Sequence, residues 1–292
     1  MSGSATQRNE NAGGDREFAF SLKDFKHIAR IAYEEAGLHM TESKAPLVYS
    51  RLAKRLRRLG IANFEAYRAL IDTEAGRGER VEMIAALTTN FTKFFREPHH
   101  FEHARAHVIA PAAAKLRAGG KLRLWSAACS TGQEPYSLAM TLLDEIPQAG
   151  NLDIKILATD IDANVRRYAV EGEYNEEAVS SIPPAFRSRF LTKASGVNGP
   201  VWRVNDDVRK LVAFRELNLI GDWPMKGAFQ AIFCRNVVIY FDQQTQDRIW
   251  PRFRKCLAPD GRLYIGHSER VSDPAFAGDG LTTYKIKPGA AK

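Results

Sequence analysis

Polar residues follow three apolar segments of this 292-residue chain, each at a point where a strand is expected to end. The segment LRLW runs into the loop SAACSTGQEP, which contains Gly132 and Glu134 and opens a helix at about Pro135. The segment KILATD ends at Asp160, and the segment AIF is followed by Cys234–Asn236. Ligands of open α/β sheets lie beyond the carboxyl ends of the strands. We therefore expect these polar residues to line one crevice.

The types of these residues indicate an adenosine-containing ligand. Two interpretations of Glu134 are open: it binds a cationic amino-acid tail of the ligand, or it complements the dipole of its own helix. Asp160 is placed to accept both hydrogen bonds of a ribose diol, whereas Asp162 suits the N-cap of the next helix. Asn236 offers a donor and an acceptor to an adenine edge or a substrate, or it caps a helix. Gly132 is the single glycine of its loop, so the G-x-G-x-x-G fingerprint of a dehydrogenase is missing.

The sequence pattern of residues 18–90 predicts consecutive helices and no strand. We therefore expect a small all-helical domain. Ser21 and Asp24 form a capping-box pattern before apolar residues at helical spacing, and Gly37 is a stop signal. The further helices are expected at Pro46–Leu59, after an Asn63 cap, and near Glu79–Thr89.

The sequence pattern of residues 91–292 predicts alternating strands and helices. Pro98 is expected to open a long helix to about Arg117. The expected strands are Leu122–Ala127, Ile154–Thr159, Val212–Glu216, Phe229–Phe233, Arg262–Gly266 and Thr282–Ile286, and the helices between them are Pro135–Glu145, Asn164–Val170 and Thr245–Cys256. This order predicts an α/β fold with a Rossmann-like, mainly parallel sheet and an antiparallel pair at its last edge. Residues 172–211 break the rhythm and are expected to form a small inserted β-subdomain.

Residues 1–17 are polar and are expected to be a disordered tail. No apolar run approaches the ~18–20 residues that span a bilayer, and no secretion signal is visible, so we expect a cytoplasmic protein without membrane insertion. Cys129, Cys234 and Cys256 match no zinc or disulfide spacing and are expected to be buried, reduced thiols.

Basic residues are in excess: the net charge is +8 and the pI is about 9.4. Such a charge favours an acidic partner, which is a nucleic acid, an anionic membrane or a carboxylate-rich protein surface. Four cations, Arg51, Lys54, Arg55 and Arg58, recur along one stripe of the expected 46–59 helix. Two interpretations are open for this stripe, a solvated face or a docking surface.

Several long segments together resemble the chemotaxis receptor methyltransferase family, known as CheR. The matching stretches are LVYSRLAKRLRRLG, LTTNFTKFFREPHHF, WSAACSTGQEPYSLAM, ATDID, ELNL, IFCRNVVIYFD and GHSE. They keep the order of the family and cover nearly the whole chain outside the tail. The resemblance implies a class I methyltransferase domain over residues 91–292, S-adenosyl-L-methionine as cofactor and S-adenosyl-L-homocysteine as product.

The resemblance also implies roles for individual residues. The residues matching cofactor contacts of the family are Asn90, Thr92, Arg96, Gly132, Glu134, Asp160, Asn218, Leu219, Arg235 and Asn236. Arg96 and Tyr240 are expected nearest the reacting methyl group, as catalytic residues. The implied acceptor is a glutamate side chain in the cytoplasmic helical region of a methyl-accepting chemotaxis receptor, and the enzyme is expected to be a monomer.

A glutamate acceptor simplifies the chemistry that the chain must supply. A carboxylate is ionised at neutral pH and can attack the methyl group without a general base. The enzyme then needs to position and desolvate the reactants. This agrees with the lack of a Ser-His-Asp or paired-acid pattern. His99, His100 and His103 are read as surface or packing histidines, and no metal is predicted.

Two other interpretations of the function compete with that of a receptor methyltransferase. A nucleic-acid methyltransferase would suit the positive charge, but no motif for a ring nitrogen or carbon acceptor is visible. A non-catalytic adaptor that senses the cofactor would suit the fold, but the set Arg96, Glu134, Asp160, Asn236 and Tyr240 is complete.

Overall fold

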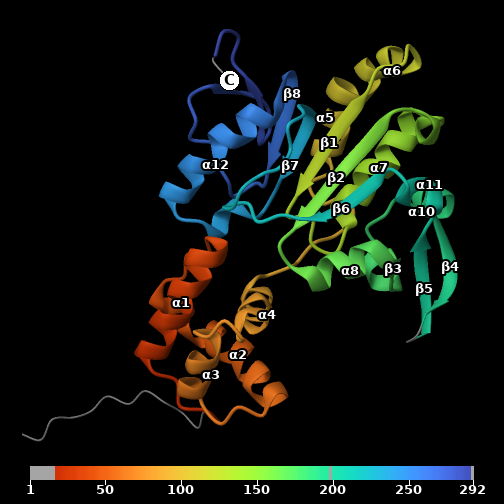
Figure 1. The fold of residues 1–292 in the computed structure, drawn as a ribbon. Helices are drawn as coiled ribbons and strands as arrows, with labels where there is room; N and C mark the ends of the chain where they lie inside the picture. The colour runs from red at the N-terminus through yellow and green to blue at the C-terminus, as the bar shows by residue number, and fades with distance from the viewer. Residues whose placement is uncertain (1–16, 197–198, 291–292) are drawn as a thin grey trace, which may run out of the picture. The chain divides into compact units, whose positions relative to one another are not determined.

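The computed structural model describes residues 17–196 and 199–290 (Figure 1). Residues 1–16 of the expected tail lie outside this part, as do two residues of the loop in the insertion. The chain divides into two compact units. One comprises the residues up to Ile31 together with Met40–Leu87, and the other comprises Ala32–His39 and Thr88–Lys292. Within the described residues, no helix combines the length and the apolarity needed to cross a membrane.

The first unit is helical, as the sequence predicts. Its helices are α1 (Leu22–Ala36, whose last turn belongs to the second unit), η1 (Glu42–Lys44), α2 (Ala45–Leu59), α3 (Phe64–Ile71) and α4 (Arg77–Leu87). The capping box is confirmed, because the Ser21 hydroxyl accepts from the Asp24 N–H and the Asp24 carboxylate accepts from the Ser21 N–H. Asn63 caps α3 by accepting from the Ala66 N–H, and Gly60 ends α2 in a left-handed conformation.

The second unit is built on a seven-stranded sheet with the strand order β6-β2-β1-β7-β8-β10-β9. The strands are β1 (Leu122–Ala127), β2 (Ile154–Asp160), β6 (Val212–Glu216), β7 (Phe229–Cys234), β8 (Leu257–Ile265), β9 (Phe276–Gly280) and β10 (Thr283–Ile286). Neighbours from β6 to β8 pair in parallel, whereas β10 is antiparallel to both β8 and β9. The predicted mainly parallel sheet with an antiparallel edge is confirmed.

Two details of the sheet differ from the sequence prediction. Strand β9 was not expected, because FAGDG carries glycines and little apolar alternation. Strand β8 begins at Leu257 rather than Arg262, directly after α12. Its pairing with β7 shifts between Leu257 and Arg262, so the turn-like residues Pro259–Gly261 are accommodated as an irregularity inside the strand.

Helices cover both faces of this sheet (Figure 1). They are α5 (His99–Ala104), α6 (Ala110–Arg117), α7 (Gln133–Glu145), α8 (Ala163–Glu171) and α12 (Gln243–Cys256), with a π-turn at Arg105–Ile109 between α5 and α6. Alternate residues of β1 divide between the faces: Leu122 and Leu124 join the core under α7, and Trp125 and Ala127 join the core under α12. The long helix predicted from Pro98 to Arg117 thus contains a π-turn, which precedes Pro111 in the first turn of α6.

The insertion contains a separate three-stranded sheet of order β3-β5-β4. Its strands are β3 (Glu173–Tyr174), β4 (Leu191–Gly196) and β5 (Gly199–Val204), and its short helices are α9 (Glu176–Val179), α10 (Pro184–Phe190) and α11 (Asp206–Arg209). Both strand pairings are antiparallel. Tyr174 at the start of this segment packs edge-on against Phe94 and donates a hydrogen bond to the carbonyl of Thr131. The insertion is therefore anchored to the loop that follows β1.

Candidate functional site

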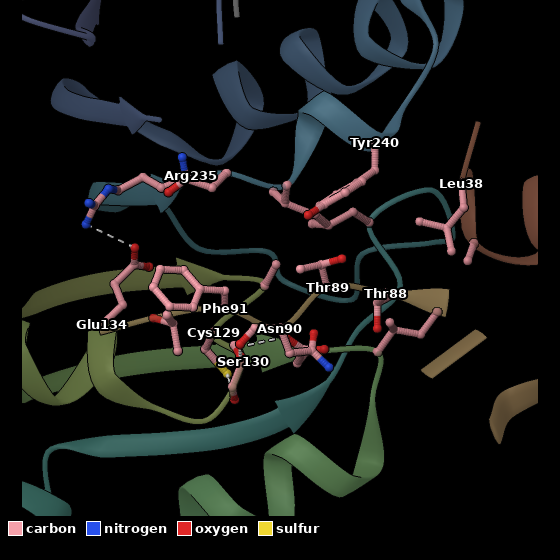
Figure 2. A pocket seen from close by; sticks show the side chains of 18 of the residues that line it. Leu38, Thr88, Thr89, Asn90, Phe91, Cys129, Ser130, Glu134, Arg235 and Tyr240 are labelled. Atoms are coloured by element: carbon pink, nitrogen blue, oxygen red, sulfur yellow. Dashed lines mark hydrogen bonds and ion pairs between the residues drawn. The ribbon is translucent and has the colours of Figure 1, made fainter. Parts of the chain in front are cut away.

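A cavity of the second unit lies at the carboxyl ends of β1, β2, β6 and β7 (Figure 2). It is lined by Ala36, Leu38, Thr88–Lys93, Arg96, Ala128–Ser130, Glu134, Asp160, Ile161, Leu217–Leu219, Arg235–Val237, Tyr240 and Phe241. Every residue expected to bind the cofactor or to act in catalysis is among them except Gly132. The expectation that the three polar segments share one crevice is thus met by the geometry.

The loop between β1 and α7 follows an unusual backbone path. Ala128 and Ser130 have φ values of 59° and 49°, in the left-handed region that side chains rarely adopt. Gly132 has a φ of 92°, and a Cβ atom there would lie 2.9 Å from the Cβ of Ala169. Gly132 therefore shapes the turn and the close approach to α8, rather than lining the cavity.

Glu134 is held in place by two protein contacts. One oxygen accepts a hydrogen bond from the Ser126 hydroxyl at 2.7 Å, and the other lies 3.3 Å from Nη1 of Arg235. Burial raises the pKa of Glu134, and the Arg235 guanidinium opposes this shift. A cationic ligand group beside Glu134 would favour its ionised form.

Two aspartates lie at and just after the end of β2, and the helix cap predicted at Asp162 is confirmed. Asp162 caps α8 by accepting from the Asn164 N–H, and its other oxygen accepts from the Asn90 side chain. Asp160 lines the cavity and accepts one backbone N–H on each oxygen, from Ser130 at 2.8 Å and from Asp162 at 3.0 Å. A carboxylate offers about four acceptor positions, so about two remain for a diol. Burial raises the pKa of Asp160.

Arg235 and Asn236 follow β7, and side chains that do not line the cavity help to hold them in place. Asn236 has a φ of 59°, and its N–H donates to the Glu269 carboxylate, as do the N–H groups of Val237 and Val238. Arg235 is almost fully buried and reaches both Glu134 and Glu97, at 3.3 Å each. The strand-end pair is thus held by two acids, Glu97 and Glu269, to which the sequence reasoning assigned no role.

The other expected residues complete the walls. Arg96 donates to the Phe91 carbonyl and lies over the Phe91 ring, whose side chain is 71% exposed. Tyr240 is half-buried and faces Asn90 and Ser130 across the cavity (Figure 2). Asn218 donates to the carbonyl of Glu35, which ties the end of α1 to this wall. Two lining residues, Leu38 and Phe91, were not predicted from the sequence. Leu38 follows Gly37 and Phe91 lies within the segment NFTKFFRE, and no other local sequence pattern marks them.

The cysteines and histidines agree with packing roles. Burial raises the pKa of the Cys129 and Cys234 thiols well above its usual value, so both thiols are neutral. Glu97, His99 and His100 bring three potential metal-ligand atoms within 4.8 Å of one another. The Arg235 guanidinium already lies beside that Glu97 carboxylate, and its positive charge opposes a metal cation there.

The basic stripe of α2 is not a uniform solvated face, which corrects the docking prediction for Arg55. This residue is 8% exposed, and its guanidinium binds Glu79 through two hydrogen bonds and Glu82 through a third. Helical spacing identifies a common face, but α4 packs on part of that face. Arg51 is half-buried and donates to the carbonyl of Leu87 at the end of α4, whereas Lys54 and Arg58 are exposed.

The side chains that line the cavity fit an adenosine ligand with an amino-acid tail. Glu134 suits a cationic amine, Asp160 suits a ribose diol, and apolar residues at Leu38, Leu217 and Leu219 suit an adenine ring. The Rossmann-like sheet and this cavity define the class of nucleoside-binding α/β proteins.

Comparison with known families makes the assignment specific. The model "CheR methyltransferase, SAM binding domain" matches residues 90–279, and the model "CheR methyltransferase, all-alpha domain" matches residues 23–88. The chain belongs to the CheR methyltransferase family. It is an S-adenosylmethionine-dependent methyltransferase, and S-adenosylmethionine is its cofactor.

Curated relatives of similar length support this membership. A probable chemotaxis protein methyltransferase of Rhizobium etli is 49% identical over 87% of this chain and 96% of its own length. Chemotaxis protein methyltransferase 2 of Pseudomonas aeruginosa is 43% identical, over 88% and 89%. The chemotaxis protein methyltransferase of Escherichia coli is 40% identical, over 92% of each chain.

Proposed function

We propose that this enzyme transfers the methyl group of S-adenosylmethionine to glutamate side chains of methyl-accepting chemotaxis receptors. The observation that carries the proposal is the gathering of Glu134, Asp160, Arg96 and Tyr240 around one cavity, in a chain of the CheR family. The relatives named chemotaxis protein methyltransferases support the choice of receptors as acceptors.

The cavity residues are proposed to divide the cofactor among them. Glu134 binds the ammonium group, and Asp160 accepts from the ribose hydroxyls. Asn218 and Leu219 line the adenosine, and Asn236 offers its amide to the adenine edge or the acceptor. Arg235, Asn90, Thr92 and Arg96 complete the binding set, and Gly132 supports it by shaping the loop between β1 and α7.

The bound cofactor supplies an electrophilic methyl group on a cationic sulfur, and the protein positions the acceptor for in-line attack. The half-buried Arg96 offers a guanidinium that attracts the acceptor carboxylate from solvent into the cavity. Tyr240 on the opposite wall narrows the approach to one direction. The acceptor is already ionised, so no residue has to remove a proton. Catalysis then rests on orientation and on exclusion of water.

A direct measurement of the product tests this function. Purified enzyme and S-adenosylmethionine carrying a tritiated methyl group are incubated with chemoreceptor-containing membranes and, separately, with transfer RNA. Base-labile label on receptor glutamates, located by mass spectrometry, is the expected result. Label on RNA would favour a nucleic-acid methyltransferase, and cofactor binding without any methyl ester would favour an adaptor.

The exposed part of the basic stripe is proposed to dock the acidic helical region of the receptor. Of the predicted stripe, Lys54 and Arg58 are exposed, and Arg57, which the prediction did not include, is exposed beside them. Arg57 pairs with Glu17 and Arg58 pairs with Glu82, and both glutamates are partly exposed. Such surface pairs are weak, so a more acidic surface competes for these cations.

A charge reversal tests the docking surface. The double variant Lys54→Glu/Arg58→Glu is expected to raise the KM for receptor about tenfold, with the cofactor Kd unchanged. Arg55→Gln is the contrast: it breaks a buried ion pair and is expected to lower the free energy of unfolding by about 3 kcal/mol. An unchanged KM in the double variant would remove the docking role.

A cytoplasmic location and a monomeric state accompany this proposal. The location is inferred from an acceptor in the cytoplasmic region of receptors. The monomeric state is inferred from a cavity whose lining residues all belong to the second unit of one chain. Sedimentation of the purified enzyme tests the second point.

A further inference from the structure

The turn that carries Arg96 has an unfavourable backbone. Phe95 and Glu97, which flank Arg96, have φ values of 52° and 55°, and neither is glycine. Such conformations persist where surrounding contacts hold them, and they concentrate at functional sites. The contacts that hold this turn therefore decide where the Arg96 side chain points.

The side chain of Arg235 supplies one of these contacts. Its Nη2 donates a hydrogen bond to the backbone carbonyl of Arg96 and lies 3.3 Å from the Glu97 carboxylate. Its Nη1 reaches Glu134, as the dashed line in Figure 2 shows. The Arg235 side chain is 2% exposed, so it binds the turn almost out of contact with water.

Glu97 in turn fixes Arg235. One Glu97 oxygen accepts from Nδ1 of His267 at 3.0 Å, and the other lies 3.4 Å from Nδ1 of the buried His100. His100 is itself held through Nε2 by the Thr282 side chain at 2.8 Å. Burial raises the pKa of Glu97, but Arg235, His267 and His100 outweigh it and hold the pKa below its ordinary value. The carboxylate is thus an anion: His267 donates to one oxygen, and the other oxygen lies at ion-pair distance from Arg235 and His100 without a hydrogen bond among the described residues.

We propose that Glu97 is a positioning residue: it holds the Arg235 guanidinium against the Arg96 carbonyl and so presents Arg96 to the reaction cavity. Glu97 is not among the residues that line the cavity, so it acts through Arg235. This role rests on the proposed place of Arg96 near the reacting methyl group.

The variant Glu97→Gln keeps the size of the side chain and removes its charge. Arg235 then keeps Glu134 but loses the anion that orients its other arm. We expect kcat for receptor methylation at saturating cofactor to fall about tenfold or more, because small displacements of catalytic groups strongly lower the reaction rate. The Kd for S-adenosylhomocysteine is expected to change less than about threefold, since the contact with Glu134 remains.

Three companion variants isolate the role. Glu102→Gln changes an exposed glutamate of the adjacent α5 and is expected to behave as wild type. Glu97→Asp is expected to recover part of the lost kcat. In an Arg235→Lys background, which lacks the forked donor set, Glu97→Gln is expected to reduce kcat by less than about twofold further. Independent, additive losses in the double variant would overturn the proposal.

Amide hydrogen exchange supplies a readout that does not depend on the acceptor. Faster exchange at residues 95–97 in Glu97→Gln, with protection of the central strands unchanged, is the expected result. Unchanged exchange in this turn, or global loss of protection, would overturn the positioning role. Failure of the wild-type enzyme to methylate receptors would instead count against the proposed function and leave the exchange comparison intact.

Discussion

Replacement of Glu269 by glutamine should disturb two loops at once. One Glu269 oxygen accepts from the N–H groups of Asn236 at 2.9 Å and Gly266 at 2.5 Å. The other accepts from the N–H groups of Val237 and Val238, each at 2.9 Å. The side chain is 3% exposed, and all four neighbours are donors. The position therefore requires a group that only accepts hydrogen bonds.

The size of the effect follows from this donor count. Glutamine keeps one carbonyl oxygen for two of the N–H groups and turns an NH₂ group toward the other two. A buried N–H left without an acceptor costs about 1–3 kcal/mol, so two cost about 2–6 kcal/mol. Partial relaxation and water entry favour the lower half of this range, and we expect about 3 kcal/mol off the free energy of unfolding. Asn236 and Tyr240 should then shift within the cavity wall.

Urea denaturation and calorimetric titration with S-adenosylhomocysteine measure both effects. The Kd is expected to rise about tenfold, because Asn236 follows the freed N–H groups. Glu102→Gln, an exposed glutamate of the same unit, serves as the matched control. A loss of stability below about 1 kcal/mol with an unchanged Kd would refute the view that this carboxylate holds the loop.

Two further changes separate neighbouring roles. Asp160→Ala is expected to raise the Kd for the cofactor about 10–100-fold, whereas Asp162→Ala is expected to lower helix-cap stability by about 1 kcal/mol with a smaller change in Kd; titration and urea denaturation of both distinguish them, and equal Kd values would contradict the division. Burial lowers the pKa of His100 to about 3 from its ordinary 6.5, so the unfolded chain binds a proton between these values that the folded chain does not. Stability should therefore fall as the pH drops below about 6.5, by up to about 1.4 kcal/mol per pH unit, and His100→Gln should flatten this dependence in urea titrations across pH.

The features that could be predicted from the sequence depend either on neighbouring residues alone or on a general rule of the fold. Asn63 and Asp162 cap helices because a short acceptor before an apolar helical run needs no distant partner. Glu134, Asp160 and Asn236 meet although 102 positions separate the first from the last, because parallel strands end at one edge of a sheet. Predicting the strands was enough to bring these residues together.

The basic stripe shows the limit of a periodic pattern. Spacing places Arg51, Lys54, Arg55 and Arg58 on neighbouring turns, but it does not say which other helix covers them. Glu79 and Glu82 lie one turn apart on α4 and bind the Arg55 guanidinium. In the sequence these glutamates are ordinary charged residues of an exposed helix. The buried pair therefore emerges only from the packing of α4 on α2.

Glu97 and Glu269 could not be assigned a role for a related reason. Glutamate is rarely buried, so a glutamate in a segment such as REPHH or GHSE is predicted to lie at the surface. The buried Glu269 carboxylate accepts from backbone N–H groups of the cavity loops, and the largely buried Glu97 carboxylate forms an ion pair with the Arg235 guanidinium. We propose that side chains of this kind leave the chemistry to other residues and hold the loops that carry Arg96, Asn236 and Tyr240. The residues proposed to touch the ligand can be inferred from strand ends, whereas those proposed to set their angles depend on contacts between distant segments, such as that between Glu97 and His267, 170 positions apart.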